Sequence, residues 1–345
     1  MTSSDQPSLA DLTTFRIGGP AKTVVIARSE SALIEAVRQA DDDKEPLLIV
    51  SAGSNMLVSD EGFPGTVLVV ATEGISVDLS ACAGAYLTVA AGQPWDALVA
   101  HTVAQGWSGL EMLSGIPGLV GAAPIQNIGA YGAEVASVIA RVRAFDRHTG
   151  QITTFFPADC RFGYRSSVFK QEPDRYVVLD VDLQLKISDY SAPVTYAELA
   201  LRLGIEPGDK APAAEARQGV LELRRGKGMV LDADDHDTWS AGSFFTNPII
   251  GPDQATQLPT EAPQFPLSDG TVKTSAAWLI DHAGFHKGYG SGRATLSTKH
   301  VLALTNRGDA SAEDVIALAR TIRDGVRAAY GITLTPEPNL VGLSL

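Results

Sequence analysis

The sequence predicts a protein of mixed α-helical and β-strand structure with two domains, on three observations. Segments typical of strands and of helices are interspersed along the chain. Its 345 residues are enough for two domains, each with its own core. Hydrophobic residues make up 45% and charged residues 19%, as in ordinary globular proteins. We find no internal repeat and no coiled-coil pattern, so neither architecture competes with this prediction.

Charge and cysteine content narrow the functional class. A net charge of −13 argues against unspecific binding to nucleic acid or to anionic membranes, although it leaves room for a local basic pocket. Cys82 and Cys160 lack metal-ligand spacing, so we expect two core thiols and no metal site. Their scarcity fits a reducing cytosol. The first residues show neither the basic nor the apolar stretch of an export signal, and we expect a cytoplasmic protein without membrane insertion.

The first segments read as a β–α–β unit. Residues 13–17 suggest a short strand ending in a turn, and residues 23–27 a second strand. Ser31 is expected to cap a helix that extends to about residue 40. Residues 47–50 are an apolar run of the buried-strand type, followed by the small residues 51–55. Such a loop after a strand often holds ligand phosphates, although an ordinary turn would look the same.

The middle of the chain continues with strands and one helix. We expect strands at 65–70, 86–90 and 176–185, a helix at 95–105, and a hairpin of strands at 138–146 and 151–156. Residues 159–170 place basic and aromatic side chains around a glycine and are too polar for a core. Residues 189–212 are rich in turn formers and resemble an insertion, with Tyr196 at the head of a short helix.

The last third of the chain is predicted to mix both kinds of element. We expect a helix at 215–225, a turn and aromatic strand at 239–247, a loop at 249–268, a helix at 275–283, a strand at 301–305, a long amphipathic helix at 312–330 and a strand at 332–334.

The stretch 114–132 is the most informative part of the sequence. It has five glycines, two prolines and no charge, which excludes a membrane helix. Glycine allows main-chain N–H groups to approach a ligand closely, and clustered N–H groups bind diphosphates well. The alternative is a buried glycine-rich turn within a large core. The length of the stretch and the loop at 51–55 favour a ligand site.

In their order, these motifs resemble one family closely, the UDP-N-acetylenolpyruvoylglucosamine reductases, or MurB flavoenzymes, of peptidoglycan synthesis. The matching landmarks cover nearly the whole chain: Thr14-Phe15, Gly53-Ser-Asn55, Gly65-Thr-Val67, Ile116-Pro-Gly118, residues 124–132, 160–165, 241–245, 277–281 and Glu337. The segment 124–132 is highly specific, whereas Gly-Ser-Asn alone would be weak. Tyr164-Arg165 and the insertion at 189–212 resemble the longer, type I form, in which a tyrosine loop covers the substrate.

The resemblance implies a fold and two functional regions. Residues 1–214 would form an FAD-binding region of the p-cresol-methylhydroxylase type (vanillyl-alcohol-oxidase-like), and residues 215–345 a smaller α+β substrate-binding domain. A Rossmann fold is not expected, because no Gly-x-Gly-x-x-Gly follows the first strand. The chain departs from the family pattern at Ala52, where glycine is usual, at Ala122-Ala123, and around Glu337. Ala52 must therefore have a negative φ or carry strain.

The resemblance also implies ligands and site residues. The family binds FAD non-covalently, uses NADPH as co-substrate and acts on UDP-N-acetylglucosamine enolpyruvate, and we expect a monomer. The implied FAD-binding residues are Gly53, Ser54, Asn55, Met56, Ser114, Ile116, Pro117, Gly118, Gly121, Ala122, Ile125, Gln126, Asn127, Gly129 and Gly132. The implied substrate-binding residues are Tyr164, Tyr196, Arg224, Lys227 and Asn247.

Three residues carry the implied chemistry, in which FAD supplies a hydride to the enolpyruvyl group. Arg165 would hold the substrate carboxylate, since a guanidinium matches a carboxylate with two hydrogen bonds. Protonated Glu337 would donate a hydrogen bond to the developing charge. Ser243 would give the proton. Without the resemblance, these would read as an exposed arginine, a surface glutamate and a structural serine.

Two other functions remain open at this stage. A related FAD oxidase would act on sugars or hydroxy acids and use oxygen, but no His or Cys in the glycine loops is placed for covalent flavin attachment. A non-catalytic module that binds nucleotide sugars would carry no flavin. The visible spectrum of the purified protein separates these functions from the reductase.

Overall fold

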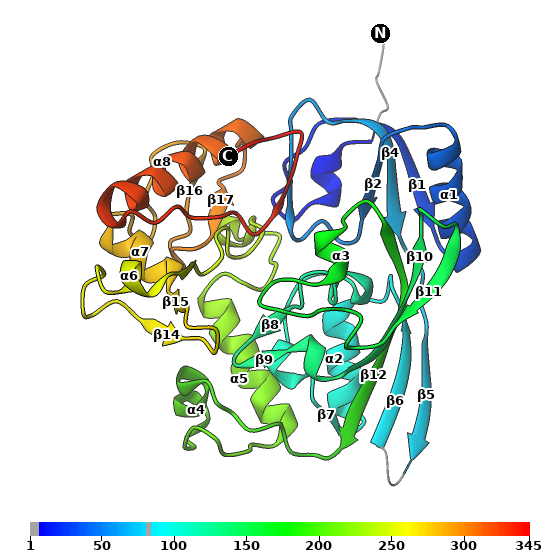
Figure 1. Cartoon of the computed structure of the whole chain (residues 1–345), viewed down its shortest axis with the longest axis horizontal. Helices are drawn as coiled ribbons and strands as arrows, with labels where there is room; N and C mark the ends of the chain where they lie inside the picture. Colours follow the sequence, from blue (N-terminus) through cyan, green and yellow to red (C-terminus); the bar gives the residue numbers. More distant parts are fainter. Residues whose placement is uncertain (1–6, 81–83) are drawn as a thin grey trace. The chain divides into compact units, whose positions relative to one another are not determined.

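A computed structural model describes residues 7–80 and 84–345. Contacts divide the chain into two compact units, each built from segments that are distant in the sequence (Figure 1). Unit 1 consists of residues 7–21, 53–64 and 227–345, and unit 2 of residues 22–52 and 65–226. The assignment of FAD to residues 1–214 and of substrate to residues 215–345 concerns ligand binding, and it stays a prediction.

Unit 2 contains a three-stranded sheet in the order β1 (Ala21–Ala27), β4 (Phe63–Val70), β2 (Leu47–Val50). The β2 strand runs parallel to β4, and α1 (Glu30–Asp42) precedes it in the chain. The prediction of a helix here is confirmed, but its cap is Ser29, whose hydroxyl accepts a hydrogen bond from the Ala32 N–H. The predicted Ser31 cap is therefore two residues too late.

The larger sheet of unit 2 is antiparallel and supplies its main core. Its order is β11 (Gln151–Phe155), β10 (Ile139–Asp146), β12 (Tyr176–Ile187), β6 (Gly84–Ala90) and β5 (Ile75–Ser80), with β7 (Trp107–Ser108) paired to β12. The predicted hairpin is confirmed as β10–β11. Leu87, Val142 and Leu183 are fully buried and pack in one cluster with α2 (Trp95–Ala104). The prediction missed β5, an edge strand exposed along almost its whole length.

Short elements and two helices complete unit 2. The short elements are η2 (Glu111–Leu113), η3 (Val120–Ala122), β8 (Gly129–Ala130), β9 (Ala133–Glu134), η4 (Val135–Ser137) and α3 (Val168–Gln171). The predicted insertion forms α4 (Ala197–Leu203), which begins directly after Tyr196 as expected. It packs on α5 (Ala213–Gly226) through Leu199 and Val220, which share a small apolar cluster.

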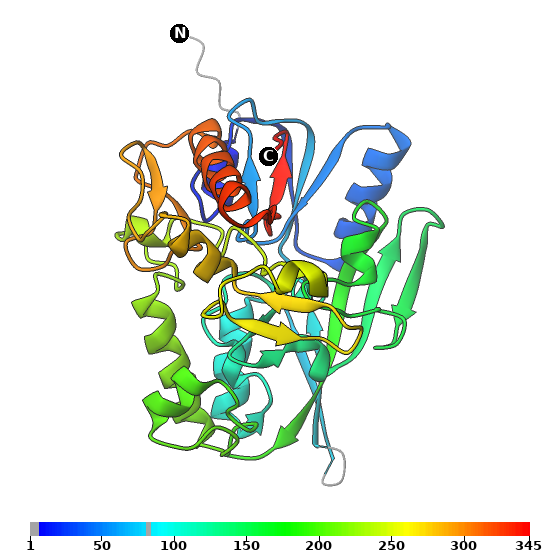
Figure 2. The same ribbon diagram turned by 60° about the vertical axis from the view of Figure 1, so that its left-hand side comes forward.

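Unit 1 combines small sheets with helices around a separate core. In the first sheet, β3 (Met56–Val58) runs parallel to β18 (Asn339–Val341). The second is antiparallel, in the order β13 (Ile249–Ile250), β15 (Val272–Thr274), β14 (Gln264–Pro266). The third is a hairpin of β16 (Ala294–Leu296) and β17 (Leu304–Asn306). The remaining elements are η1 (Leu9–Leu12), η5 (His236–Thr238), α6 (Pro252–Ala255), α7 (Ala276–His282) and α8 (Ala312–Tyr330). Figure 2 shows α8 beside the β16–β17 hairpin. Phe15, Phe244 and Ile322 are fully buried in this core.

Several predictions for unit 1 are wrong. Residues 13–17 form no strand, because the Thr13 hydroxyl donates to the Ile17 carbonyl at 2.9 Å and closes a turn. Residues 332–334 are apolar because Ile332 and Leu334 fill the core, and the last strand is β18. Residues 239–247 form only an isolated bridge at Phe245, and the expected strand at 301–305 begins at Leu304.

Three further sequence expectations have a structural outcome. The segment 249–268, predicted as a loop, contains β13, α6 and β14. Cys160 is buried as expected, while Cys82 lies outside the described residues. Within residues 7–80 and 84–345, every helix is too short or too polar to cross a bilayer.

Candidate active site

The loop at residues 53–55 is fixed from two sides within unit 1. Gly53 has φ +56°, and a Cβ atom there would lie 1.8 Å from the Leu12 carbonyl oxygen, so only glycine fits. Its own carbonyl accepts a hydrogen bond from the Thr14 N–H at 3.2 Å. The Asn55 carbonyl accepts from the Asn339 N–H at 3.0 Å, and the Asn55 Nδ2 lies 3.5 Å from the Glu337 carbonyl oxygen. The predicted FAD loop is thus tied to the segment that carries Glu337.

A short ladder brings Ser243 and Glu337 into one part of unit 1. The Glu337 N–H donates to the Phe244 carbonyl at 2.8 Å, and the Thr246 N–H donates to the Thr335 carbonyl at 3.1 Å. Ser243 is half-buried, and its hydroxyl makes no hydrogen bond with the residues that the structure describes. That hydroxyl is free of internal competition for a reacting group. Two of the three predicted catalytic residues therefore lie on adjacent paired segments.

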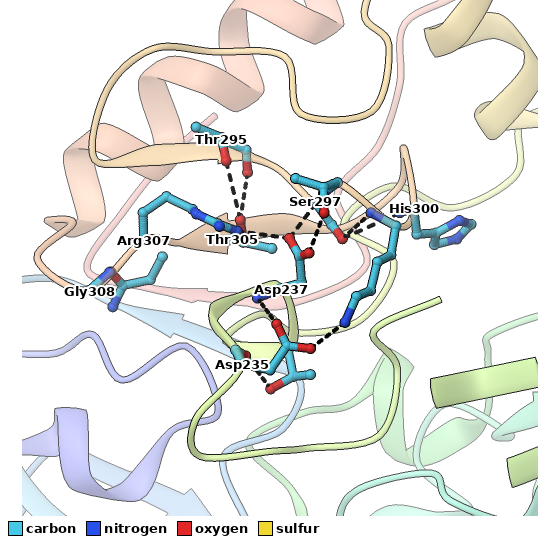
Figure 3. Close-up of polar contacts among 12 residues, drawn as sticks. Asp235, Asp237, Thr295, Ser297, His300, Thr305, Arg307 and Gly308 are labelled. Atoms are coloured by element: carbon cyan, nitrogen blue, oxygen red, sulfur yellow. Dashed lines mark hydrogen bonds and ion pairs between the residues drawn. The ribbon is translucent and has the colours of Figure 1, made fainter. Parts of the chain in front are cut away.

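A buried carboxylate supports the chain just before Ser243. Asp237 is 4% exposed and accepts hydrogen bonds from the Thr298 N–H (2.9 Å), the Thr298 hydroxyl and Arg307 (2.8 Å) (Figure 3). Burial opposes its ionisation, but these hydrogen bonds outweigh burial and lower the pKa of Asp237 below its usual value. Nearby, Asp235 pairs with Lys299. The network anchors η5 to Thr298 and Lys299, between β16 and β17, and to Arg307, directly after β17. The next turn along the chain, at residues 240–243, is called the Ser243 turn.

Arg165 is held by the main chain of the glycine-rich stretch in unit 2. Its Nη2 donates to the Gly129 carbonyl at 2.9 Å and its Nη1 to the Asn127 carbonyl at 3.5 Å, while the guanidinium lies 5.4 Å from the Tyr164 ring centroid. Both Arg165 and Asn127 have positive φ, +51° and +47°. Non-glycine residues seldom adopt this conformation, and they concentrate at ligand sites. The geometry thus presents Arg165 from a rigid, strained loop.

The side chain of Asn127 forms hydrogen bonds to other parts of unit 2. Its Nδ2 donates to Glu134 at 2.8 Å and to the Gly163 carbonyl at 3.2 Å, and its Oδ1 accepts from the Ala136 N–H at 3.1 Å. The side chain is 1% exposed. These bonds join the glycine-rich stretch to the segment that carries Tyr164 and Arg165. The contacts of the Asn127 side chain therefore stabilise the glycine-rich stretch. A contact between Asn127 and FAD stays a prediction.

Two glycines of the stretch are required by local packing and backbone conformation. At Gly121 a Cβ would lie 2.6 Å from the Ala91 Cβ, and at Gly132, with φ +83°, it would lie 2.3 Å from the Thr195 Oγ1. The Ser114 hydroxyl is also internal, since it donates to the Glu111 carbonyl at 2.6 Å. Glycine at these positions therefore does not by itself indicate a ligand, and the predicted FAD contacts of the stretch remain predictions.

Tyrosines and an arginine form a cluster in unit 2. The rings of Tyr131 and Tyr196 meet edge to face at 5.2 Å between centroids. Burial raises the pKa of Tyr131 to about 12, although the nearby positive charge of Arg224 acts to lower it. Burial also lowers the pKa of Arg224, although Tyr131 and Asp96 act to raise it. The structure thus brings together the predicted substrate residues Tyr196 and Arg224, and adds Tyr131, which the sequence analysis did not select.

The remaining predicted residues divide between the two units. Unit 1 holds Gly53, Ser54, Asn55, Met56, Lys227, Ser243, Asn247 and Glu337, and unit 2 holds the predicted FAD residues from Ser114 to Gly132 together with Tyr164, Arg165, Tyr196 and Arg224. Asn247 Oδ1 accepts from the Ala276 N–H at 3.0 Å and so fixes the start of α7. In the described part of the chain, no cluster of three or more His, Cys, Asp or Glu side chains could hold a metal.

Comparison with known families places this chain among the FAD-binding proteins. A family model described as an FAD binding domain matches residues 21–155. A second model, the C-terminal domain of UDP-N-acetylenolpyruvoylglucosamine reductase, matches residues 234–341.

Relatives of known name extend over the whole chain. The UDP-N-acetylenolpyruvoylglucosamine reductase of Cutibacterium acnes is 57% identical, over 100% of this chain and 92% of its own length. That of Streptomyces avermitilis is 54% identical, over 98% and 94%. The crystal structure of the enzyme from Thermus caldophilus (MurB) matches with a TM-score of 0.67 and 29% identity, over 98% of both chains. The chain belongs to the UDP-N-acetylenolpyruvoylglucosamine reductase family.

Proposed function

We propose that the chain reduces UDP-N-acetylglucosamine enolpyruvate to UDP-N-acetylmuramate, with NADPH as reductant and non-covalently bound FAD, as a step of peptidoglycan precursor synthesis. Its relatives carry the name of this activity. The observation that supports it best is the ladder in unit 1. There, the predicted FAD loop, Glu337 and the segment of Ser243 are joined by consecutive main-chain and side-chain hydrogen bonds.

The residues present fit FAD. The Gly53 loop packs so closely against Leu12 that no side chain could occupy its turn, and the main chain of a tight, glycine-containing loop suits a diphosphate. In unit 2, the Ser51 hydroxyl at the end of β2 is shielded from solvent and bonds to no described residue. A donor of this kind suits a phosphate oxygen. When bound, FAD would take a hydride from NADPH and deliver it to the β-carbon of the enolpyruvyl group.

The protein then has to manage the charge and one proton. Arg165 binds the substrate carboxylate through its paired N–H groups, and its contacts with Gly129 and Asn127 limit its rotation. Glu337, in its protonated form, donates a hydrogen bond to the enolate-like charge. The Ser243 hydroxyl transfers its proton to the α-carbon, which completes the saturation of the double bond.

The diphosphate of the substrate needs cations within an acidic protein. Arg224 and Lys227 provide them, because a guanidinium and an ammonium each bind phosphate oxygens. Tyr196, at the start of α4, would cover the sugar, and Tyr131 supports its ring from the side. Asn247 positions α7 and offers its amide to the sugar. Tyr164 lies beside Arg165 and would contact the enolpyruvyl end.

The visible spectrum provides the test. Purified protein should be yellow, should bleach on anaerobic addition of NADPH, and should recover its colour when UDP-N-acetylglucosamine enolpyruvate is added. Recovery with oxygen but not with this substrate would indicate an oxidase. A colourless protein that binds the nucleotide sugar would indicate the non-catalytic module. We also propose a cytoplasmic monomer, which the low cysteine content supports as to compartment; gel filtration with light scattering tests the monomer.

A further inference from the structure

Thr14 makes two hydrogen bonds to two different functional segments of unit 1. Its N–H donates to the Gly53 carbonyl at 3.2 Å, and its hydroxyl donates to the Ser240 carbonyl at 2.6 Å. The first partner belongs to the predicted FAD loop, and the second lies three residues before Ser243. Thr14 is only 6% exposed, so water cannot easily replace either bond.

The segment around Thr14 is itself immobilised. The Phe15 carbonyl accepts from the Asn306 Nδ2 at 2.9 Å, and the Asn306 N–H donates to the Trp239 carbonyl at 3.0 Å. One residue of β17 therefore holds both the Thr14 segment and the residue before Ser240. The hydroxyl of Thr14 thus links two segments, and Asn306 holds each of them in place separately.

The Ser240 carbonyl is the anchor on the N-terminal side of the Ser243 turn. Gly242 has φ +73° and donates its N–H to the Ser240 Oγ at 3.1 Å, so the turn between them is tight. On the other side of Ser243, the Phe244 N–H donates to the Leu302 carbonyl at 2.8 Å. A shift of the Ser240 peptide would therefore rotate the turn about the Phe244 anchor and displace the Ser243 hydroxyl.

We infer that Thr14 is a positioning residue that sets the Ser243 turn relative to the predicted FAD loop. The inference rests on the proposed function. Because the two bonds come from different atoms, they can be separated by mutation. Thr14→Val removes the hydroxyl bond to Ser240 and keeps the amide bond to Gly53. The substitution should disturb proton delivery and leave the binding and reduction of FAD intact.

The experiment measures the two half-reactions of the holoenzyme separately by stopped flow. For Thr14→Val, we expect FAD reduction by NADPH within about threefold of wild type, and substrate-dependent reoxidation slowed about 10- to 100-fold, as displaced reacting groups typically show. The solvent deuterium isotope effect on reoxidation should rise, because proton transfer becomes slower than the other steps. Thr14→Ser should restore the rate, and Thr14→Cys, a weaker donor of similar size, should lie between them.

Thr13→Val is the matched control. Thr13 is equally buried, at 7%, but its hydroxyl bonds only to Ile17 within the same segment. It should lower the melting temperature without changing the ratio of the two half-reactions. Equal slowing of both half-reactions by Thr14→Val, or the same altered ratio in Thr13→Val, would overturn the inference. If Thr14→Val does not fold, Thr14→Cys decides by the same ratio. Failure of the wild type to be reoxidised by the substrate would instead refute the proposed function.

Discussion

Asp237→Asn should destabilise unit 1 by about 2 kcal/mol at pH 7. The Asp237 carboxylate accepts two hydrogen bonds from Thr298 and one from Arg307. Hydrogen bonds to a charged group contribute about 1.5–3 kcal/mol each, and those between neutral groups about 0.5–1.5 kcal/mol. An asparagine can keep the bonds from the Thr298 N–H and Arg307 on its one oxygen, but each becomes about 1 kcal/mol weaker without the carboxylate charge, which gives about 2 kcal/mol. Its NH₂ group can donate to the Thr298 hydroxyl, which is able to accept. The Arg307 side chain is 32% exposed, so its charge remains partly hydrated. Its bond to Asp237 should therefore contribute a free energy near the lower end of the range for charged groups.

The pH dependence of this loss has a definite sign. The folded-state pKa of Asp237 is lowered, so the carboxylate stabilises the fold at neutral pH, and this contribution disappears as the pH falls through the folded pKa. The difference between wild type and Asp237→Asn should be constant from pH 7 to about pH 5. Below about pH 4, near the pKa of an unfolded aspartate, it should shrink.

Urea unfolding at pH 7, 5 and 3.5 measures this difference. Asp235→Asn is the matched control, because Asp235 pairs with Lys299 and both side chains are about one third exposed. An exposed ion pair contributes only about 0.2–1 kcal/mol, so the control should unfold close to wild type. A loss for Asp237→Asn that is the same at all three pH values would refute the assignment to the charge. So would a loss no larger than that of the control.

Three further predictions concern the site. Ser243→Ala should leave FAD reduction by NADPH intact and slow substrate-dependent reoxidation by about 10²–10⁴-fold; parallel loss of both half-reactions would make Ser243 a folding residue. Arg165→Lys should lower kcat/KM about 100-fold, because an ammonium cannot form the paired contact, and near-normal steady-state activity would remove Arg165 from the catalytic set. Gly53→Ala should cost more than about 3 kcal/mol and abolish retention of FAD, since the new Cβ would meet the Leu12 carbonyl oxygen at 1.8 Å; a yellow protein of normal melting temperature would contradict this.

The sequence predicted best those elements that carry their own boundary signals. The helix at 312–330 has the predicted ends, because Ser311 and Asp314 form a capping box and Gly331 ends the helix in the left-handed conformation. Residues 332–334 were predicted as a strand because apolar residues fill a core equally well from a loop. Ala52 lies outside the residues with positive φ, which settles the departure from the usual glycine in favour of an unstrained backbone.

The site was predictable mainly through the family pattern. Nothing local in the sequence marks Ser243 and Glu337 as neighbours, because the ladder between them depends on residues far apart along the chain. Tyr131 lies within the recognised segment 124–132, but its ring contact with Tyr196 depends on how the insertion folds. Thr14 belonged to a recognised landmark, yet its partners Gly53 and Ser240 could be found only from the structure.

The pairing of β3 with β18 has a consequence for synthesis on the ribosome. Asn55 and Glu337 are separated by 282 residues, and the β3–β18 ladder begins directly beside them. Unit 2 ends at residue 226, so all of its strands have emerged while unit 1 still lacks its last one. During translation, β3 therefore lacks its partner β18 until almost the entire chain has been made, and Glu337 cannot pair with the segment that carries Ser243 before that point.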